Sequence, residues 1–199
     1  MKIGIDFSIN STAICIQSDE MKLFSFVPDY RSTLSGFKIH NKISDIVDII
    51  SYDKKSTTKD PIEDQSIKLS NADSLSNAII STIEPFITGI PEIRIEGFSF
   101  GSKGNAFIDI ITYNTFLKVK IIQKWGNCIS VISPKTVKKL YTGNGNASKC
   151  DMLRTFFTKE DSIFKQRFED LGLNREEDFN IPKPIDDLID SVALCSIQI

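Results

Sequence analysis

The sequence predicts an α/β protein in which a mixed β-sheet is covered by helices on both faces. Three observations support this prediction. Short apolar runs typical of strands come first, apolar stripes with helical spacing follow, and further strands alternate with those helices. Because tight links join antiparallel strands and helical crossovers join parallel ones, we expect both kinds of pairing in one sheet.

The N-terminal part contains three strand-like runs, at residues 2–7, 11–16 and 22–27. Each has about the length of one strand, and short polar links separate them, which predicts an antiparallel meander. Residues 28–73 show no clear periodicity. Within them, the polar stretch 52–60 is expected to form an exposed loop.

Helices and strands alternate in the rest of the chain. An apolar stripe predicts a helix from Leu75 that Gly89 and Pro91 close, and a second stripe predicts a helix over residues 107–124. Further strands are expected at residues 92–96 and 128–132, and further helices at 134–143, at 147–157 and from residue 184 onward. We expect residues 1–199 to form a single domain with insertions near 28–73 and 158–183.

Composition narrows the classes of function. The chain has 199 residues and a net charge of −2, so a nucleic-acid partner would have to be held by a local basic patch. No apolar run approaches the roughly 20 residues of a membrane span, and the N-terminus does not resemble a secretory signal, so we expect a cytoplasmic protein without membrane contact. The four scattered cysteines and the single histidine, His40, do not form a zinc motif, and His40 is interpreted as a surface or packing residue.

Acidic residues stand at three separate places where a metal ion could be bound. Asp6 and Glu96 each end a predicted strand, which is where α/β sheets place their sites. Asp187 and Asp190 share one face of the last helix and would repel each other without a cation between them. The alternative interpretation, a charge that complements the helix dipole, explains Asp186 well, Asp187 partly and Asp190 poorly. Oxygen ligands of this kind suit two Mg²⁺ ions, for which Mn²⁺ is an expected substitute.

A basic segment precedes the last acidic cluster. Its glycine-containing turn at residues 143–146 would let backbone N–H groups approach a phosphate, although a solvated helix face is an equally good interpretation. Phe98 and Phe100 follow Glu96 in a loop flanked by glycines, where they would either stack on an unpaired base or pack in the core. The basic residues are Lys135, Lys138, Lys139, Lys149 and Arg154.

Taken in order, these motifs resemble those of the RuvC-type Holliday junction resolvases. The resemblance rests on residues 3–6, 95–96, 137–149 and 187–193, which are similar to the family's first strand, IE motif, lysine-glycine block and terminal DxxDAxA signature. Ser8 and Ala13 stand where the family has glycines. The abundance of Ile, Lys, Asn and Ser suggests an AT-rich genome, and with it a viral or phage origin and a place in the host cytoplasm.

The resemblance implies a ribonuclease H-like fold, a homodimer and a metal-dependent endonuclease that resolves four-way DNA junctions in recombination and repair. It also implies roles for individual residues. Asp6, Glu96, Asp187 and Asp190 would be the catalytic metal ligands, and Lys138, Lys139, Lys149, Phe98 and Phe100 would contact DNA. Two alternatives stay open: a nuclease of the same fold that acts on RNA–DNA hybrids, flaps or other branched DNA, and a catalytically silent nucleic-acid-binding module.

Overall fold

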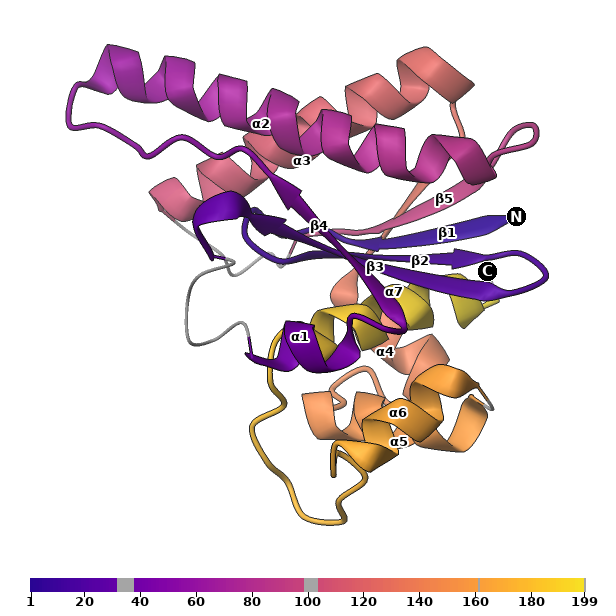
Figure 1. Ribbon diagram of the computed structural model, residues 1–199. Coiled ribbons are helices and arrows are strands. Elements are labelled where there is room, and N and C mark those ends of the chain that lie inside the picture. Colours follow the sequence, from indigo (N-terminus) through magenta and orange to yellow (C-terminus); the bar gives the residue numbers. More distant parts are fainter. Residues whose placement is uncertain (32–37, 99–103, 161, 199) are drawn as a thin grey trace.

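A six-stranded mixed sheet forms the centre of the protein (Figure 1). The computed structural model describes residues 1–31, 38–98, 104–160 and 162–198. Across the sheet the strands run in the order β4-β3-β2-β1-β5-β6. Their bounds are β1 (Lys2–Asp6), β2 (Thr12–Gln17), β3 (Met21–Pro28), β4 (Val47–Tyr52), β5 (Glu92–Glu96) and β6 (Ile129–Ile132).

Strand pairing confirms the expected mixture of directions. The strand β2 is antiparallel to both β1 and β3, which is the predicted meander. The strand β5 is parallel to β1 and to β6, and β4 adds a further parallel strand beside β3. In the register between β1 and β5, Ile5 lies opposite Ile95, so these two parallel strands end side by side.

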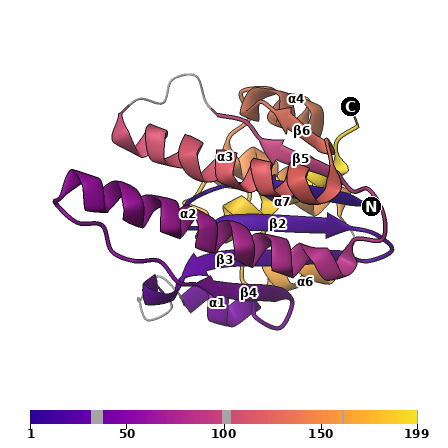
Figure 2. The same cartoon turned by 90° about the horizontal axis from the view of Figure 1, so that it is seen from above.

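Helices cover both faces of this sheet (Figures 1 and 2). Two long helices, α2 (Pro61–Ile83) and α3 (Asn105–Trp125), lie on one face. The other face is covered by α1 (Lys38–Ile43), α4 (Pro134–Thr142), α5 (Lys149–Lys159), α6 (Ile163–Asp170) and α7 (Ile185–Ser196). Short 3₁₀ helices occupy Asp29–Arg31 and Glu84–Phe86. None of the helices in the described ranges is long and apolar enough to cross a lipid bilayer.

The two cores follow from the alternation of side chains along the strands. Ile3 and Ile5 of β1 are fully buried in the core beneath α2 and α3, as are the alternate residues Ile14 and Ile16 of β2. Cys15, between those two, faces the other core together with most of the apolar residues of α7. The last helix therefore packs directly on the central strands.

Two expectations about residues 28–73, which show no clear periodicity, are wrong. The helix expected from Leu75 begins at Pro61, because Asp60 caps it by accepting hydrogen bonds from the backbone N–H groups of Ile62 (3.0 Å) and Glu63 (2.9 Å). Tyr52, expected in an exposed loop, is the buried last residue of β4.

His40 is buried in α1, as the packing interpretation expected. Burial lowers the pKa of its imidazole to about 4, because the apolar surroundings disfavour the charged form.

Candidate functional site

Two acidic side chains meet where β1 and β5 end. Asp6 is the last residue of β1, and Glu96 is the last residue of β5. Each follows the opposed pair Ile5 and Ile95, so the two acids stand at the same level on neighbouring parallel strands. Both belong to the face covered by α7, because the isoleucines before them point to the opposite core. The ends of these two parallel strands thus bring Asp6 and Glu96 together at one edge of the sheet.

Helix α7 brings Asp187 and Asp190 to the same place because it lies unusually close to β1. A Cβ atom added to Gly4 would stand 2.2 Å from the carbonyl oxygen of Ser191, so only glycine allows this approach. The same C-terminal part of α7 is also held by Arg94 of β5, whose buried guanidinium donates to the carbonyl oxygen of Leu194 at 2.9 Å. The sheet therefore fixes both the distance and the direction of α7.

The four acids influence one another. Burial is the largest cause that raises the pKa of each, and it raises those of Glu96 and Asp190 to about 7. The pKa of Asp6 is raised well above its usual value by burial, and the negative charges of Asp190, Asp187 and Glu96 raise it further. Burial and the charge of Asp186 raise the pKa of Asp187. The residues that sequence spacing singled out thus form one electrostatic group.

Sequence reasoning missed the groups that hold Asp187. Ser11, in the link between β1 and β2, donates a hydrogen bond from Oγ to Asp187 Oδ2 at 2.6 Å. On the other side, the ammonium of Lys183 contacts Asp187 Oδ1 and lies 3.2 Å from Asp186 Oδ2. The separation of 176 residues between Ser11 and Asp187 explains why no local pattern revealed their contact.

Asp186, interpreted from the sequence as a charge that complements the helix dipole, stands in the first turn of α7. It is buried, and Lys149 of α5 contacts its Oδ2 atom. Its other oxygen, Oδ1, is buried without a hydrogen-bond partner among the described residues. An unpartnered buried carboxylate oxygen is costly, so this atom is available for a cation.

The chemistry of this donor set suits a hard divalent cation, because all the ligands are carboxylate oxygens. The side chains are not, however, arranged around a single point. Within residues 1–31, 38–98, 104–160 and 162–198, no three His, Cys, Asp or Glu side chains stand close enough together to hold one metal ion. Positive charge reaches the acids instead from Lys183 and Lys149.

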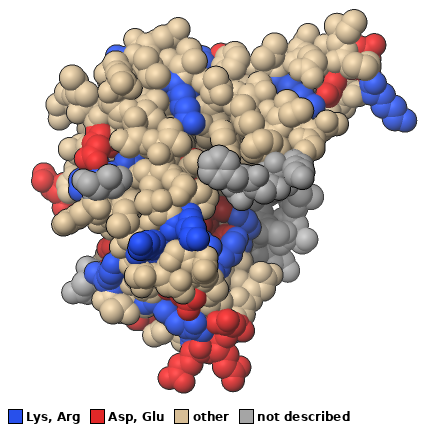
Figure 3. All heavy atoms as spheres, turned by 180° about the vertical axis from the view of Figure 1, so that it is seen from behind, with Lys and Arg blue, Asp and Glu red and all other residues tan. Residues whose placement is uncertain are grey.

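The basic segment lies beside the acids. The charges of Lys138 and Lys149 both lower the pKa of Glu96, and the hollows lined by Glu96 and by Lys138 both include Phe98. Lys138 donates to the carbonyl oxygen of Ala147 at 2.8 Å and so joins α4 to the glycine-containing turn. Lys139 is exposed and, at about 100° per helical residue, points in another direction from α4. In Figure 3, basic side chains gather around a hollow in which acidic atoms are visible.

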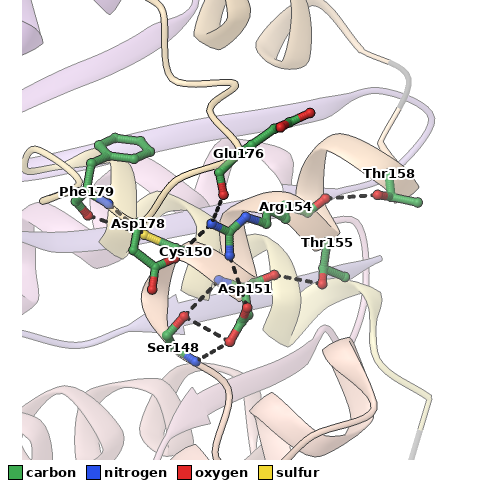
Figure 4. Close-up of polar contacts among 9 residues, drawn as sticks. All are labelled: Ser148, Cys150, Asp151, Arg154, Thr155, Thr158, Glu176, Asp178 and Phe179. Carbon is green, nitrogen blue, oxygen red and sulfur yellow. Dashed lines mark hydrogen bonds and ion pairs between the residues drawn. The ribbon is translucent and has the colours of Figure 1, made fainter.

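Arg154, by contrast, is part of the scaffold of α5. Its guanidinium pairs with Asp178 at 2.8 Å and with Asp151 at 3.3 Å, and also contacts the carbonyl oxygen of Glu176 (Figure 4). Ser148 and Asp151 form a capping box at the start of the same helix. This network fixes the first turn of α5, which carries Lys149.

Phe98 lies between the acids and the basic segment. Its ring packs edge-on against Phe107 with 5.8 Å between centroids, and the ammonium of Lys118 lies 5.3 Å from its centroid. One hollow of about 180 Å³ on its side includes Glu96 in its lining, and another of about 480 Å³ includes Lys138. Phe98 is therefore partly packed and partly accessible, and its stacking on an unpaired base stays a prediction.

Phe100, the other candidate for base stacking, lies outside the described residues.

Comparisons with known proteins show what the fold resembles. No protein-family model and no curated protein sequence matches the chain. Among solved structures, Thermus thermophilus RuvC is 13% identical, with a TM-score of 0.50 over 98% of this chain and 90% of that chain. T. thermophilus RuvC in complex with a Holliday junction substrate is 12% identical, with a TM-score of 0.52 over 98% and 89%. The yeast mitochondrial Holliday junction resolvase Ydc2 is 17% identical, with a TM-score of 0.48 over 98% and 77%.

At such low identity the likeness establishes the fold. The likeness extends over 98% of this chain, including its six-stranded mixed sheet and the helices on both faces. The chain therefore has the ribonuclease H-like α/β fold of the RuvC Holliday junction resolvases, as the sequence predicted.

Proposed function

We propose that this protein is a metal-dependent DNA endonuclease that resolves four-way junctions. The observation that carries the proposal is the meeting of Asp6, Glu96, Asp187 and Asp190, from two strand ends and one helix, beside basic α4 and α5. One structure with the same fold is RuvC in complex with a Holliday junction substrate. Clustered carboxylates that would bind divalent ions support phosphodiester hydrolysis as the reaction. The adjacent lysines favour a nucleic acid as the substrate.

The four acids would hold two Mg²⁺ ions, with Mn²⁺ as a substitute. When bound, such ions supply an activated water and stabilise the leaving oxygen in phosphodiester hydrolysis. The protein contributes the placement of these ligands. Asp6 and Glu96 are fixed by the register of β1 and β5, and Asp187 is fixed by its hydrogen bond from Ser11.

Lys138 and Lys149 would hold the phosphate to be cut and its neighbours. Their charges already act on Glu96, lowering its pKa, so a phosphate held by them would be brought to the acids. Such contacts position the backbone but do not read the base sequence. Phe98, accessible from the hollow beside Lys138, would stack on a base that is unpaired at the junction.

Selectivity for a four-way junction requires two sites with the same symmetry as the DNA. We propose that the protein acts as a homodimer, in which each chain cuts one of two equivalent strands.

The first experiment compares substrates and one matched set of variants. End-labelled four-way junction, linear duplex, flap and RNA–DNA hybrid are incubated with Mg²⁺ and with the unchanged chain, Asp6→Asn, Glu96→Gln or Asp48→Asn. Asp48 is an exposed acid on β4, away from the site, and serves as the control. We expect paired, symmetric nicks in the junction, which Asp6→Asn and Glu96→Gln abolish and Asp48→Asn preserves.

A binding measurement distinguishes the loss of catalysis from the loss of DNA recognition. In Ca²⁺, both site variants should bind the junction about as tightly as the unchanged chain, because they remove metal ligands and leave the lysines in place. Preferred cleavage of the hybrid or flap would keep the active site but replace the substrate. Tight junction binding without cleavage of any substrate would contradict the endonuclease proposal in favour of a silent binding module.

A further inference from the structure

Lys183 reaches from solvent into the buried acids. It stands two residues before α7, and 53% of its side chain is exposed. The side chains of Asp187 and Asp186, which its ammonium contacts, are only 6% and 3% exposed. A lysine that bridges two nearly buried carboxylates is a strong electrostatic partner, because water screens the interaction poorly there.

The two oxygens of Asp187 are both engaged. Ser11 donates to Oδ2, and the Lys183 ammonium contacts Oδ1. A divalent cation bound by Oδ1 would bring its charge into the space that the ammonium fills. Two cations cannot share that oxygen at contact distance without strong repulsion.

We propose that Lys183 is the resident counter-cation of the acidic site: it stabilises the acids in the metal-free protein and must leave Asp187 when a divalent ion binds. The inference rests on the proposed function, because it takes Asp187 as a metal ligand. It also gives a physical reason why the carboxylates are not gathered around a single point when the ammonium lies among them.

A purely structural lysine would have the opposite effect on metal binding. If Lys183 only positions Asp187, its removal leaves that ligand less ordered and weakens metal affinity. If Lys183 competes with the metal, its removal strengthens affinity, because the site keeps its negative charge and loses a positive one. The sign of the change therefore distinguishes the two roles.

The test uses Lys183→Met, which keeps the length of the side chain and removes its charge. Binding of Mn²⁺ is measured from the electron paramagnetic resonance signal of the free ion. Lys124→Met is the control, because Lys124 is also an ion-paired, partly exposed lysine but lies at the far end of α3 and pairs with Glu84. We expect Lys183→Met to bind Mn²⁺ about tenfold more tightly, as loss of one nearby charge predicts, and Lys124→Met to bind it unchanged.

Thermal unfolding provides a second test of the same inference. In EDTA, Lys183→Met should unfold at a lower temperature than the unchanged chain, since the buried acids lose their counter-charge. Added Mn²⁺ should raise its unfolding temperature by more than it raises that of the unchanged chain. Equal or weaker Mn²⁺ binding in Lys183→Met would overturn the inference.

A measurement on the unchanged chain avoids any folding defect of the variant. Amine acylation, read by mass spectrometry, should modify Lys183 faster in Mn²⁺ than in EDTA, because the displaced ammonium is released from Asp186 and Asp187. Modification of Lys124 should not change. An unchanged or slower reaction at Lys183, while Mn²⁺ binding is observed, would overturn the inference alone. Failure of the unchanged chain to bind Mn²⁺ at all would overturn the proposed metal site and this inference together.

Discussion

Lys149 is the residue through which the basic segment and the acidic site meet. Its side chain is 60% exposed, yet its ammonium contacts the nearly buried Asp186. A phosphate that approaches from solvent can share this ammonium, because Asp186 uses only one side of it. We therefore expect Lys149 to contact the DNA while it stays beside the acids.

Replacing Lys149 tests this position. Lys149→Ala should weaken junction binding and reduce the slope of log affinity against log salt concentration by about one, because one fewer counterion is released per complex. Fluorescence anisotropy in Ca²⁺ at several salt concentrations measures both quantities. Lys124→Ala, which removes a lysine paired with Glu84, should leave the slope unchanged. An unaltered slope in Lys149→Ala would mean that its ammonium does not contact phosphate.

Sequence reasoning at the scale of residues found the acids but not their partners. Asp6 and Glu96 are recognisable because each follows an apolar strand, and Asp187 and Asp190 because they share a helix face. The contacts of Ser11 and Lys149 with the acids of α7 join residues 176 and 37 positions apart. Such pairs depend on how the elements pack, and a single sequence carries no local pattern for them.

At the scale of elements, the contact between α7 and β1 decides the geometry of the site. Gly4 allows the backbone of α7 to approach β1, and the same helix carries Asp187 and Asp190. Any side chain at this position would push α7 away from the strand that carries Asp6. Stability and the proposed cleavage are therefore both expected to depend on one close contact.

Gly4→Ala should therefore destabilise the protein by about 3 kcal/mol, because the added methyl meets backbone atoms that cannot move alone. Urea unfolding at equilibrium measures this change. The matched variant is Gly145→Ala, whose methyl would lie 3.1 Å from the flexible side chain of Lys135, and it should lose much less stability. Gly4→Ala should also cut the junction more slowly under conditions where it remains folded. Stability equal to that of the unchanged chain would show that α7 shifts without cost.

The start of α2 shows why one element was mispredicted. The first buried residue of this helix is Asn71, ten residues after it begins at Pro61. Its first turns extend beyond the sheet (Figures 1 and 2), so no apolar stripe marks them. The capping residue Asp60 and the proline after it are the same kind of signal that identified Ser133-Pro134, and they would have located the start.

At the scale of the whole molecule, the order of elements was enough to predict a mixed sheet and five of its strands, whereas β4 lies in a segment without clear periodicity and was not predicted. Short links predicted the antiparallel meander, whereas the parallel pair β1 and β5, which unites Asp6 with Glu96, joins strands that β2, β3 and β4 separate in the sequence. Dimerisation could not be predicted in the same way, because it depends on surface contacts that leave no periodic pattern in the sequence of one chain. The homodimer accordingly stays a prediction that needs its own experiment.

Mixed assemblies provide that experiment. If each chain of a homodimer cuts one strand, an equal mixture of unchanged chain and Asp6→Asn should form roughly half of its dimers with one active site, provided that subunits exchange freely. Such dimers would leave singly nicked junctions, which a supercoiled cruciform plasmid distinguishes from paired cuts because one nick relaxes it and two linearise it. We therefore expect relaxed circles to accumulate in the mixture and linear plasmid to dominate with the unchanged chain. Linear and relaxed products in unchanged proportion would show that one chain makes both cuts or that the chains do not pair.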